Sequence, residues 1–523
     1  MKIDKGLLAR LNLEAAAEIE LAKSNRLMPS RPDRQTLVGR GSEVEKTLRN
    51  GYVKGHFGDR ADVVFVDKNR RGRRPISEMT LRDRVLYRAL VTLIAESLPM
   101  HLVNRIPNAE FKTRPLDVDG VRYISKTDVV AYYEFIDHGR LADELEAQTG
   151  EAPAIDVLME LLFRIMGRRV GLPQVHQASD ILGDTYIDPV RRRMVRAGYA
   201  VTTYSDDFRI ATKTLGEARL GLEDCAREVR ALGLTLNEGK TFTFTVKSYR
   251  TSLAAFGEAE RQLFENGDAG DVGLLFLDDY PDESPTATST GAPALADTEA
   301  QAVTDEDALD SHDGASAEIS EAQEKAAIKA WKIWLHEEET EEQQSKPEAA
   351  ITESLLGRAL PILGRAGRDV AVGSLSHLLR YEPTLTPQIA KYITELGTTS
   401  PQARKKLRAA LNGLVDAAIL SNWQKIWLAS AAGALGTARG KLDHYHWLMK
   451  CVDEADPALA ATAAAALGQL KYGDVEAMKA ALDRVGPVWR TLVLWGIAQM
   501  DTATAEAVAD DLLERKLLGE AQP

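Results

Sequence analysis

The sequence predicts an α+β fold in the first half of the chain and an all-α fold in the last third. Residues 1–250 alternate between segments with helical apolar spacing and short runs of strand-forming residues. From residue 350 to 523, apolar residues recur at helical spacing almost without interruption. A chain of 523 residues is too long for a single hydrophobic core, so separate domains are expected.

The first informative segment is GRRPISEMTLRDRVLYRAL at 72–90. A basic turn and an extended Arg-Pro step precede an Asp-Arg pair that opens a helix. The basic cluster Lys68–Arg74 suits contact with phosphate groups. The later cluster Arg191–Arg196 is better explained as a solvated helix surface.

Residues 123–135 (YISKTDVVAYYEF) read as an apolar, strand-like run that is interrupted by Asp128. A carboxylate in such surroundings is costly unless it pairs with, or ligates, a cation. The segment VGLPQVHQAS at 170–179 then predicts a turn that leads into a helix.

Two adjacent acids, Asp206 and Asp207, lie between the expected strands Tyr199–Thr203 and Phe208–Thr212. The pattern predicts a hairpin that displays both carboxylates at its tip. A close pair of carboxylates repels itself and favours a divalent cation such as Mg²⁺, which takes hard oxygen ligands. With Asp128, three carboxylates would come from two segments, which is typical of a two-metal site for nucleotidyl transfer. A further turn, LTLNEGKT at 234–241, carries the cationic Lys240.

Taken in order, these segments resemble the palm and fingers of reverse transcriptases. The matching motifs are Asp128 with Tyr133, GLPQ at 171–174 with Ser179, YSDD at 204–207, LNEGKT at 236–241 and the fingers-like segment 72–90. The resemblance implies a right-hand polymerase with fingers and palm over 1–250. It also implies that the enzyme adds dNTPs to a 3′-hydroxyl and binds RNA or single-stranded DNA.

The resemblance further assigns roles to individual residues. Asp128, Asp206 and Asp207 would be catalytic and would hold Mg²⁺ or Mn²⁺, with the backbone carbonyl of Val129 as a further ligand. Four positions are implied to bind the nucleotide. Tyr133 would lie under the sugar and exclude a 2′-hydroxyl, and Gln174 would lie beside the sugar and base. Arg74, with Arg71 or Arg73, would bind the triphosphate, and Lys240 would lie near the leaving group. One departure is Val175, where the family usually has a Gly. Glycine permits close backbone approach or unusual dihedrals, and valine is expected to permit neither.

The formal net charge of −13 is unevenly distributed. Residues 1–250 are mildly basic, whereas 251–349 are strongly acidic and rich in Ala, Ser, Thr, Gly and Pro. That composition predicts a partly disordered linker, with a helix near 321–342. Only two cysteines occur, Cys225 and Cys451, and neither an apolar membrane span nor a signal peptide is apparent, so a cytoplasmic protein without membrane contact is expected.

Residues 350–523 suggest paired helices stacked in a HEAT-like repeat array, with the tryptophans as packing residues. The spacing Arg439-X4-His444 resembles that of some helical RNA-cleaving domains but lacks a second polar element, so we expect no catalysis there.

A polymerase core joined to such an array resembles the bacterial abortive-infection and defence-associated reverse transcriptases. This resemblance implies antiphage defence, with DNA synthesis that is RNA-templated, untemplated or protein-primed, and a homo-oligomer. Two alternatives stay open: an RNA-templated retroelement or intron enzyme, for which no maturase-like segment is found, and a non-catalytic nucleic-acid-binding scaffold, which would not need all three acids.

Overall fold

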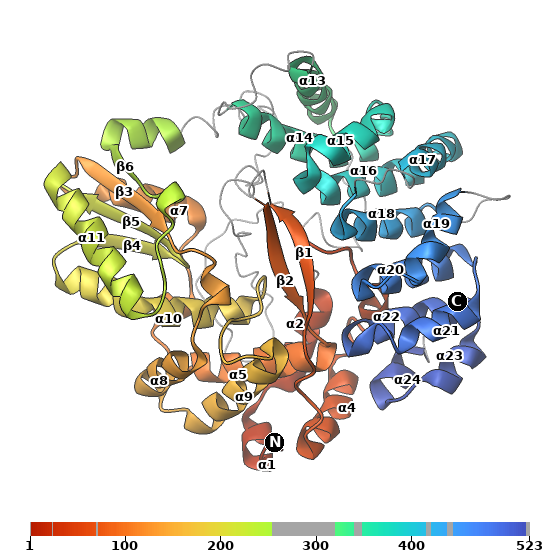
Figure 1. The fold of residues 1–523 in the computed structure, drawn as a ribbon, viewed down its shortest axis with the longest axis horizontal. Coiled ribbons are helices and arrows are strands. Elements are labelled where there is room, and N and C mark those ends of the chain that lie inside the picture. Colours follow the sequence, from red (N-terminus) through yellow and green to blue (C-terminus); the bar gives the residue numbers. More distant parts are fainter. Residues whose placement is uncertain are drawn as a thin grey trace.

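The computed structural model describes residues 2–23, 25–68, 72–253, 319–338, 348–414, 420–436 and 443–518. The acidic segment expected to be disordered lies mostly outside these residues. A mixed α/β half and a helical half lie side by side, and a two-stranded hairpin stands between them (Figure 1). None of the described helices combines the length and the apolar character that a membrane crossing needs.

The segments expected to form the palm make a four-stranded antiparallel sheet with the strand order β4-β5-β3-β6, which we name the palm sheet after that expectation. Its strands are β3 (Tyr123–Asp128), β4 (Ala200–Tyr204), β5 (Asp207–Thr212) and β6 (Phe242–Thr245). The long helices α10 (Gln177–Arg196) and α11 (Leu215–Ala231) pack on this sheet (Figure 1). Phe208 and Ile210 of β5 are fully buried in the same apolar cluster as the inner faces of these helices, so the sheet is anchored on that side.

Shorter elements surround the palm. They are α1 (Lys5–Arg10), α2 (Leu13–Ala22), α3 (Pro32–Gln35), α4 (Gly41–Lys54), α5 (Leu81–Ala95), α6 (Met100–Val103), α7 (Asn108–Thr113), η1 (Arg114–Asp117), η2 (Tyr132–Glu134), α8 (His138–Thr149), α9 (Ala152–Met166) and η3 (Glu238–Lys240). Helix α5 begins at the expected position, because Thr80 caps it by accepting a hydrogen bond from the backbone N–H of Asp83.

Strands β1 (Asp62–Lys68) and β2 (Gly72–Glu78) pair as a hairpin, which we name the fingers hairpin because it overlaps the segment expected to belong to the fingers. Its side chains alternate between two faces. Val64, Val66 and Ile76 are buried on one face, whereas Phe65 on the other face is 56% exposed. The three buried residues belong to the apolar cluster of the C-terminal helices and not to that of the palm.

The C-terminal half is helical in every part that the structure describes. Its elements are α13 (Glu321–Glu338), α14 (Glu348–Arg365), η6 (Val372–Ser374), α15 (Leu375–Tyr381), η7 (Pro383–Leu385), α16 (Thr386–Thr399), α17 (Pro401–Leu414), α18 (Asn422–Ala434), α19 (Asp443–Val452), α20 (Pro457–Leu470), α21 (Val475–Leu482), α22 (Gly486–Ala498), α23 (Thr502–Val508) and α24 (Leu512–Leu518). These elements confirm the helices expected from the apolar spacing. Helices α14, α16, α18, α20 and α22 pack one on the next and form a curved stack (Figure 1).

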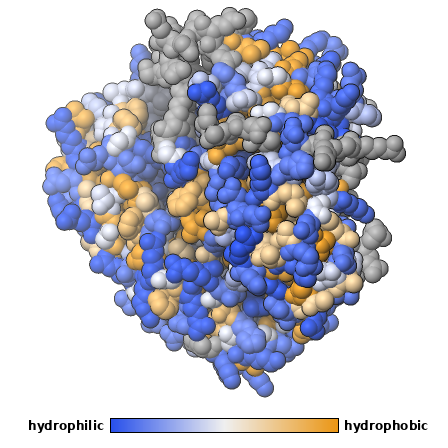
Figure 2. All heavy atoms as spheres, turned by 45° about the vertical axis from the view of Figure 1, so that its right-hand side comes forward, coloured by the Kyte–Doolittle hydropathy of each residue, from blue (hydrophilic) through white to orange (hydrophobic). Residues whose placement is uncertain are grey.

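Small residues allow the closest approach within this stack. A Cβ placed on Gly468 of α20 would lie 2.3 Å from the backbone oxygen of Gly496 in α22, so only glycine fits there. On the face shown in Figure 2, hydrophilic residues are interspersed with apolar ones over these helices.

The tryptophans pack as expected, and two of them also join the two halves of the protein. Trp423 and Trp489 are 1% and 2% exposed. The indole N–H of Trp423 donates to the backbone oxygen of Leu27 (2.6 Å), and that of Trp489 donates to Asp62 Oδ2 (2.6 Å). The helical array is therefore bonded directly to the fingers hairpin and to the loop after α2.

Candidate active site

The palm sheet brings the three expected carboxylates together. Asp128 ends β3 and lies directly opposite Asp207, the first residue of β5. Side chains of directly opposed residues share one face of a sheet, with Cβ atoms about 4.5–5.5 Å apart. Asp206 lies next to them in the turn, and its carbonyl oxygen accepts a hydrogen bond from the backbone N–H of Val129 (3.2 Å).

The hairpin differs from the sequence-based expectation in one respect. Tyr204 pairs with Asp207, so the turn consists only of Ser205 and Asp206, and Asp207 belongs to a strand rather than to the tip. Ser205 has a φ of 52°, which suits the first central residue of a two-residue turn of type II′. The tight turn separates the two acids, because it leaves Asp206 beyond the sheet while β5 holds Asp207 within it.

Cations balance the acidic cluster. Lys240 Nζ lies 2.9 Å from Asp128 Oδ2, and Arg209 Nη1 lies 3.2 Å from Asp207 Oδ1. Asp128 and Asp206 are only 5% and 6% exposed. Neighbouring carboxylates that are this well covered repel one another unless positive charge compensates them.

The oxygen donor set fits a hard divalent cation, since carboxylates are the ligands that Mg²⁺ and Mn²⁺ prefer. Among the described residues, however, no three acidic, histidine or cysteine side chains converge as a metal site. Asp128 is paired with Lys240, and Asp207 is paired with Arg209. The backbone of Val129 lies beside the turn, where its carbonyl was expected to help as a ligand.

Tyr133 and Gln174, the two residues expected at the nucleotide sugar, are both held by hydrogen bonds. The Tyr133 side chain is 3% exposed, and its hydroxyl donates to Asp180 Oδ1 (2.5 Å) and lies 3.2 Å from Ser205 Oγ. Burial, and next the charge of Asp180, raise the pKa of this phenol well above its ordinary value. Gln174 Nε2 donates to Glu134 Oε1 (3.1 Å). The Tyr133 side chain is therefore buried beneath the site and does not protrude from its surface.

In the loop before α10, Val175 has the positive φ that the glycine usual at this position would adopt easily. Val175 has a φ of 59°, so the expectation that valine would prevent an unusual dihedral is wrong. A left-handed conformation costs a non-glycine residue about 1–2 kcal/mol. The neighbours offset that cost: the Val175 side chain packs on the apolar cluster of the helical array, Ser179 Oγ donates to the backbone oxygen of Pro173, and His176 lies 3.1 Å from the buried Glu20.

The arginines expected at the triphosphate lie on the fingers hairpin. Arg73 is opposite Asp67, and its Nε lies 3.3 Å from Asp67 Oδ1. Arg74 is opposite Val66 and is half-buried. Successive strand residues point to opposite faces, so Arg73 and Arg74 cannot grip one phosphate from the same side. Arg71 lies outside the described residues.

Sequence reasoning missed three charged residues near the acids: Asp184, Arg105 and Arg209. Arg209 is 2% exposed and stacks on Phe111 at 4.8 Å. Asp184 accepts two hydrogen bonds from Arg105, at 2.5 Å and 3.0 Å. A signal was present in the sequence, since acids recur every four residues at positions 180, 184 and 188 among the mostly apolar residues of 178–190 (ASDILGDTYIDPV).

Other features that the sequence singled out have structural explanations. Arg191 and Arg192 both pair with Asp188, and Arg193 pairs with Glu228, so the second basic cluster is largely neutralised. His444 is 1% exposed, and Arg439 lies outside the described residues.

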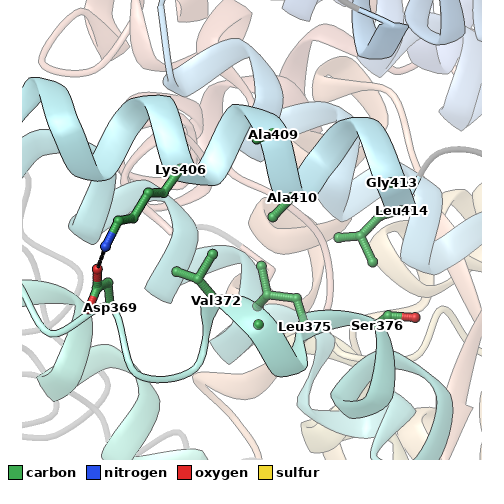
Figure 3. Close-up of a pocket in the computed structure, with 10 residues that line it drawn as sticks. Asp369, Val372, Leu375, Ser376, Lys406, Ala409, Ala410, Gly413 and Leu414 are labelled. Atoms are coloured by element: carbon green, nitrogen blue, oxygen red, sulfur yellow. Dashed lines mark hydrogen bonds and ion pairs between the residues drawn. The ribbon is translucent and has the colours of Figure 1, made fainter.

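A cavity of about 640 Å³ opens in the helical array between η6 and α17 (Figure 3). Small and apolar residues such as Val372, Leu375 and Ala410 line its centre. The charged groups that line it, Lys406 and Asp369, are paired with each other at its rim. The cavity therefore offers no arrangement of groups for catalysis, and the acids on β3 and β5 remain the candidate active site.

Comparison with known proteins agrees with this location. Residues 66–265, which include the whole palm sheet, match the family described as Reverse transcriptase (RNA-dependent DNA polymerase). A domain of this family implies nucleotidyltransferase activity of the DNA polymerase type. A comparison with curated proteins found no match.

Two solved structures of telomerase from Candida tropicalis are also similar, one in complex with the TWJ fragment of telomeric RNA and the other in the apo form. The identities are 11% and 10%, and the TM-scores are 0.29 and 0.30. The alignments cover 74% and 90% of this chain and 67% and 68% of the telomerase chains. Similarity at this level supports no further argument.

Proposed function

We propose that the chain, whose residues 66–265 match the reverse transcriptase family, adds deoxynucleotides to a 3′-hydroxyl by two-metal nucleotidyl transfer and serves in antiphage defence. The catalytic part of this proposal rests on one observation: Asp128 of β3 lies directly opposite Asp207 of β5, with Asp206 in the adjoining turn. Bound Mg²⁺ or Mn²⁺ would supply activation of the attacking hydroxyl and neutralise charge on the triphosphate.

Each residue near the acids has a role in this proposal. Asp128, Asp206 and Asp207, with the carbonyl of Val129, hold the metal. Tyr133 supports the sugar from below, and Gln174, held by Glu134, contacts the nucleotide edge. The arginines Arg73 and Arg74, with Arg71, bind the triphosphate as forked donors, and Arg73 and Arg74 act from opposite faces of the hairpin. Lys240 neutralises Asp128 in the metal-free protein and faces the leaving group once nucleotide is present.

The defence role rests on architecture. A polymerase domain followed by an all-helical stack resembles the defence-associated reverse transcriptases. In this proposal 1–250 form fingers and palm, 251–349 form a linker, and 350–523 form a HEAT-like module for self-association in the cytoplasm. The enzyme would work with RNA as template, or without a template, from a primer that the protein itself supplies.

Purified full-length protein tests the proposal when it is incubated with single dNTPs and Mg²⁺, with and without added RNA. Products are compared before and after protease treatment, and Asp206→Ala serves as the inactive control. We expect incorporation by the wild type only; a product that enters the gel only after proteolysis indicates protein priming, and dependence on added RNA indicates templating. Equal incorporation by Asp206→Ala, or none by the wild type with any dNTP, would refute the polymerase assignment. Light scattering on the same sample measures the oligomeric state.

A further inference from the structure

Helix α10 carries three acids, Asp180, Asp184 and Asp188, along one face at intervals of one turn. Asp188 pairs with Arg191 and Arg192 at the far end of the helix. Asp180 and Asp184 instead point to the region under the catalytic turn. The helix therefore places two carboxylates beside the candidate active site in addition to Asp128, Asp206 and Asp207.

Asp180 is bonded to the residue expected beneath the nucleotide sugar. Its Oδ1 accepts the Tyr133 hydroxyl at 2.5 Å, and the same hydroxyl lies 3.2 Å from Ser205 Oγ in the catalytic turn. Tyr133 and Ser205 are 3% and 1% exposed, so water competes little for these bonds. One phenol thus connects α10 to the turn that carries Asp206.

Arg105 and Asp184 complete this arrangement. Arg105 Nε lies 2.5 Å from Asp184 Oδ2, and Arg105 Nη1 lies 3.4 Å from Asp180 Oδ1. The guanidinium also lies over the Tyr204 ring, 5.3 Å from its centroid. The backbone N–H of Ser205 hydrogen-bonds Asp184. The single charge of Arg105 is therefore shared between Asp180 and Asp184, and these two acids also accept hydrogen bonds from Tyr133 and from the turn.

We propose that Asp180 is a positioning residue for sugar selection: it tethers the Tyr133 hydroxyl so that the face of the ring, and not a mobile phenol, meets the sugar of the incoming nucleotide. This inference rests on the proposed function of Tyr133. A free aromatic side chain samples several rotamers, whereas a hydrogen bond at its far end fixes the ring position. Discrimination against a 2′-hydroxyl needs a fixed ring, because a ring that can yield will admit the extra oxygen.

The test compares five variants of the full-length protein, one of which, Tyr133→Val, removes the aromatic ring itself. Asp180→Ala removes the tether, Asp180→Asn keeps an oxygen acceptor for the phenol, and Tyr133→Phe removes the hydroxyl but keeps the ring. Asp188→Ala is the matched control, because it removes an acid of the same helix that pairs with arginines away from the turn. The readout is the ratio of kcat/KM for a dNTP to that for the matching NTP.

We expect Asp180→Ala and Tyr133→Phe to lower this ratio at least several-fold, and Asp180→Asn and Asp188→Ala to keep it near the wild-type value. A wild-type ratio in both Asp180→Ala and Tyr133→Phe would overturn the inference. If Tyr133→Val lowers the ratio while Asp180→Ala does not, only the tether is refuted. If Tyr133→Val also leaves it unchanged, the proposed position of the nucleotide is refuted as well.

Hydrogen exchange provides a second test, which does not depend on catalytic activity. Peptides that cover 131–135 and 203–207 should exchange faster in Asp180→Ala than in Asp188→Ala. Equal exchange in these two variants would overturn the tether even if the protein incorporated no nucleotide.

Discussion

Lys240 Nζ lies 2.9 Å from Asp128 Oδ2, so the first of the proposed metal-binding acids is paired with a lysine from the turn after α11. The side chains of Asp128 and Lys240 are 7% and 21% exposed, and the pair is therefore only partly screened by water. A divalent metal bound at Asp128, as proposed, would compete with Lys240 for this carboxylate.

Replacing this lysine should strengthen metal binding. In Lys240→Met, Asp128 no longer loses an ion pair worth about 1 kcal/mol, so the Kd for Mg²⁺ or Mn²⁺ should fall roughly three- to ten-fold. Titration calorimetry without nucleotide measures this. Lys247→Met, at an exposed lysine just beyond β6, is the control for the change in net charge. An equal effect of the two substitutions would show that the ion pair does not oppose metal.

The two adjacent acids should differ in their effect on stability. Asp206→Ala and Asp207→Ala should both abolish incorporation, because each removes a proposed metal ligand. Asp206→Ala relieves repulsion and should leave stability unchanged or slightly higher. Asp207→Ala takes an anion from Arg209, which is 2% exposed, and should cost about 1–3 kcal/mol. Thermal unfolding in metal-free buffer compares them; equal stability of the two variants would contradict the importance of the Arg209 pair.

The helical array should support the fingers hairpin. Ser421 Oγ donates to Asp67 Oδ2 (2.7 Å) and also caps α18 by accepting from the backbone N–H of Gln424. Ser400 Oγ accepts from the N–H of Ala403 in the same way, and among the described residues it makes no bond to the hairpin, so Ser400→Ala is the matched control. Each substitution should cost about 1 kcal/mol through the lost cap.

Only Ser421→Ala should also speed hydrogen exchange in peptides that cover 62–78, because it alone frees Asp67 from the array. Unchanged exchange there would mean that the array does not hold the hairpin. Removing the whole array should have a larger effect, since Val64, Val66 and Ile76 would lose their apolar cover.

Stability should depend on His444 at mildly acidic pH. Its Nδ1 lies 2.7 Å from Asn412 Oδ1, so the neutral ring donates from Nδ1. Burial, together with the nearby Arg408, lowers the pKa of His444 to about 4. Unfolded histidine has a pKa of about 6.5 and takes up a proton in this range, whereas the folded ring does not. The stabilisation is therefore complete above about pH 6.5 and is lost as the pH falls toward 4.

The melting temperature of the wild type should accordingly fall as the pH is lowered through this window. In His444→Gln the melting temperature should decrease less over this pH range. In His446→Gln, which replaces an exposed histidine of the same helix, it should decrease as in the wild type. His176 is also buried with a lowered pKa, so part of the fall should persist in His444→Gln. The same slope in all three proteins would contradict this explanation.

Local patterns in the sequence determined the elements and the candidate acids. Apolar spacing alone predicts the helices from α14 to α22, because a helix that buries one face must repeat every three to four residues. Asp128 at the end of an apolar run, and Asp206 and Asp207 between two such runs, predict the acidic site. These features depend on neighbours within a few residues.

Only the tertiary structure decided how the site is held. The strand register places Asp207 in β5 and sends Arg73 and Arg74 to opposite faces. Packing against the array keeps Val175 in a conformation that valine avoids by itself. The bonds of Tyr133 to Asp180 and of Asp67 to Ser421 join residues 47 and 354 positions apart. Such contacts arise from burial and charge pairing between distant segments, and no local pattern specifies which partner a side chain will meet.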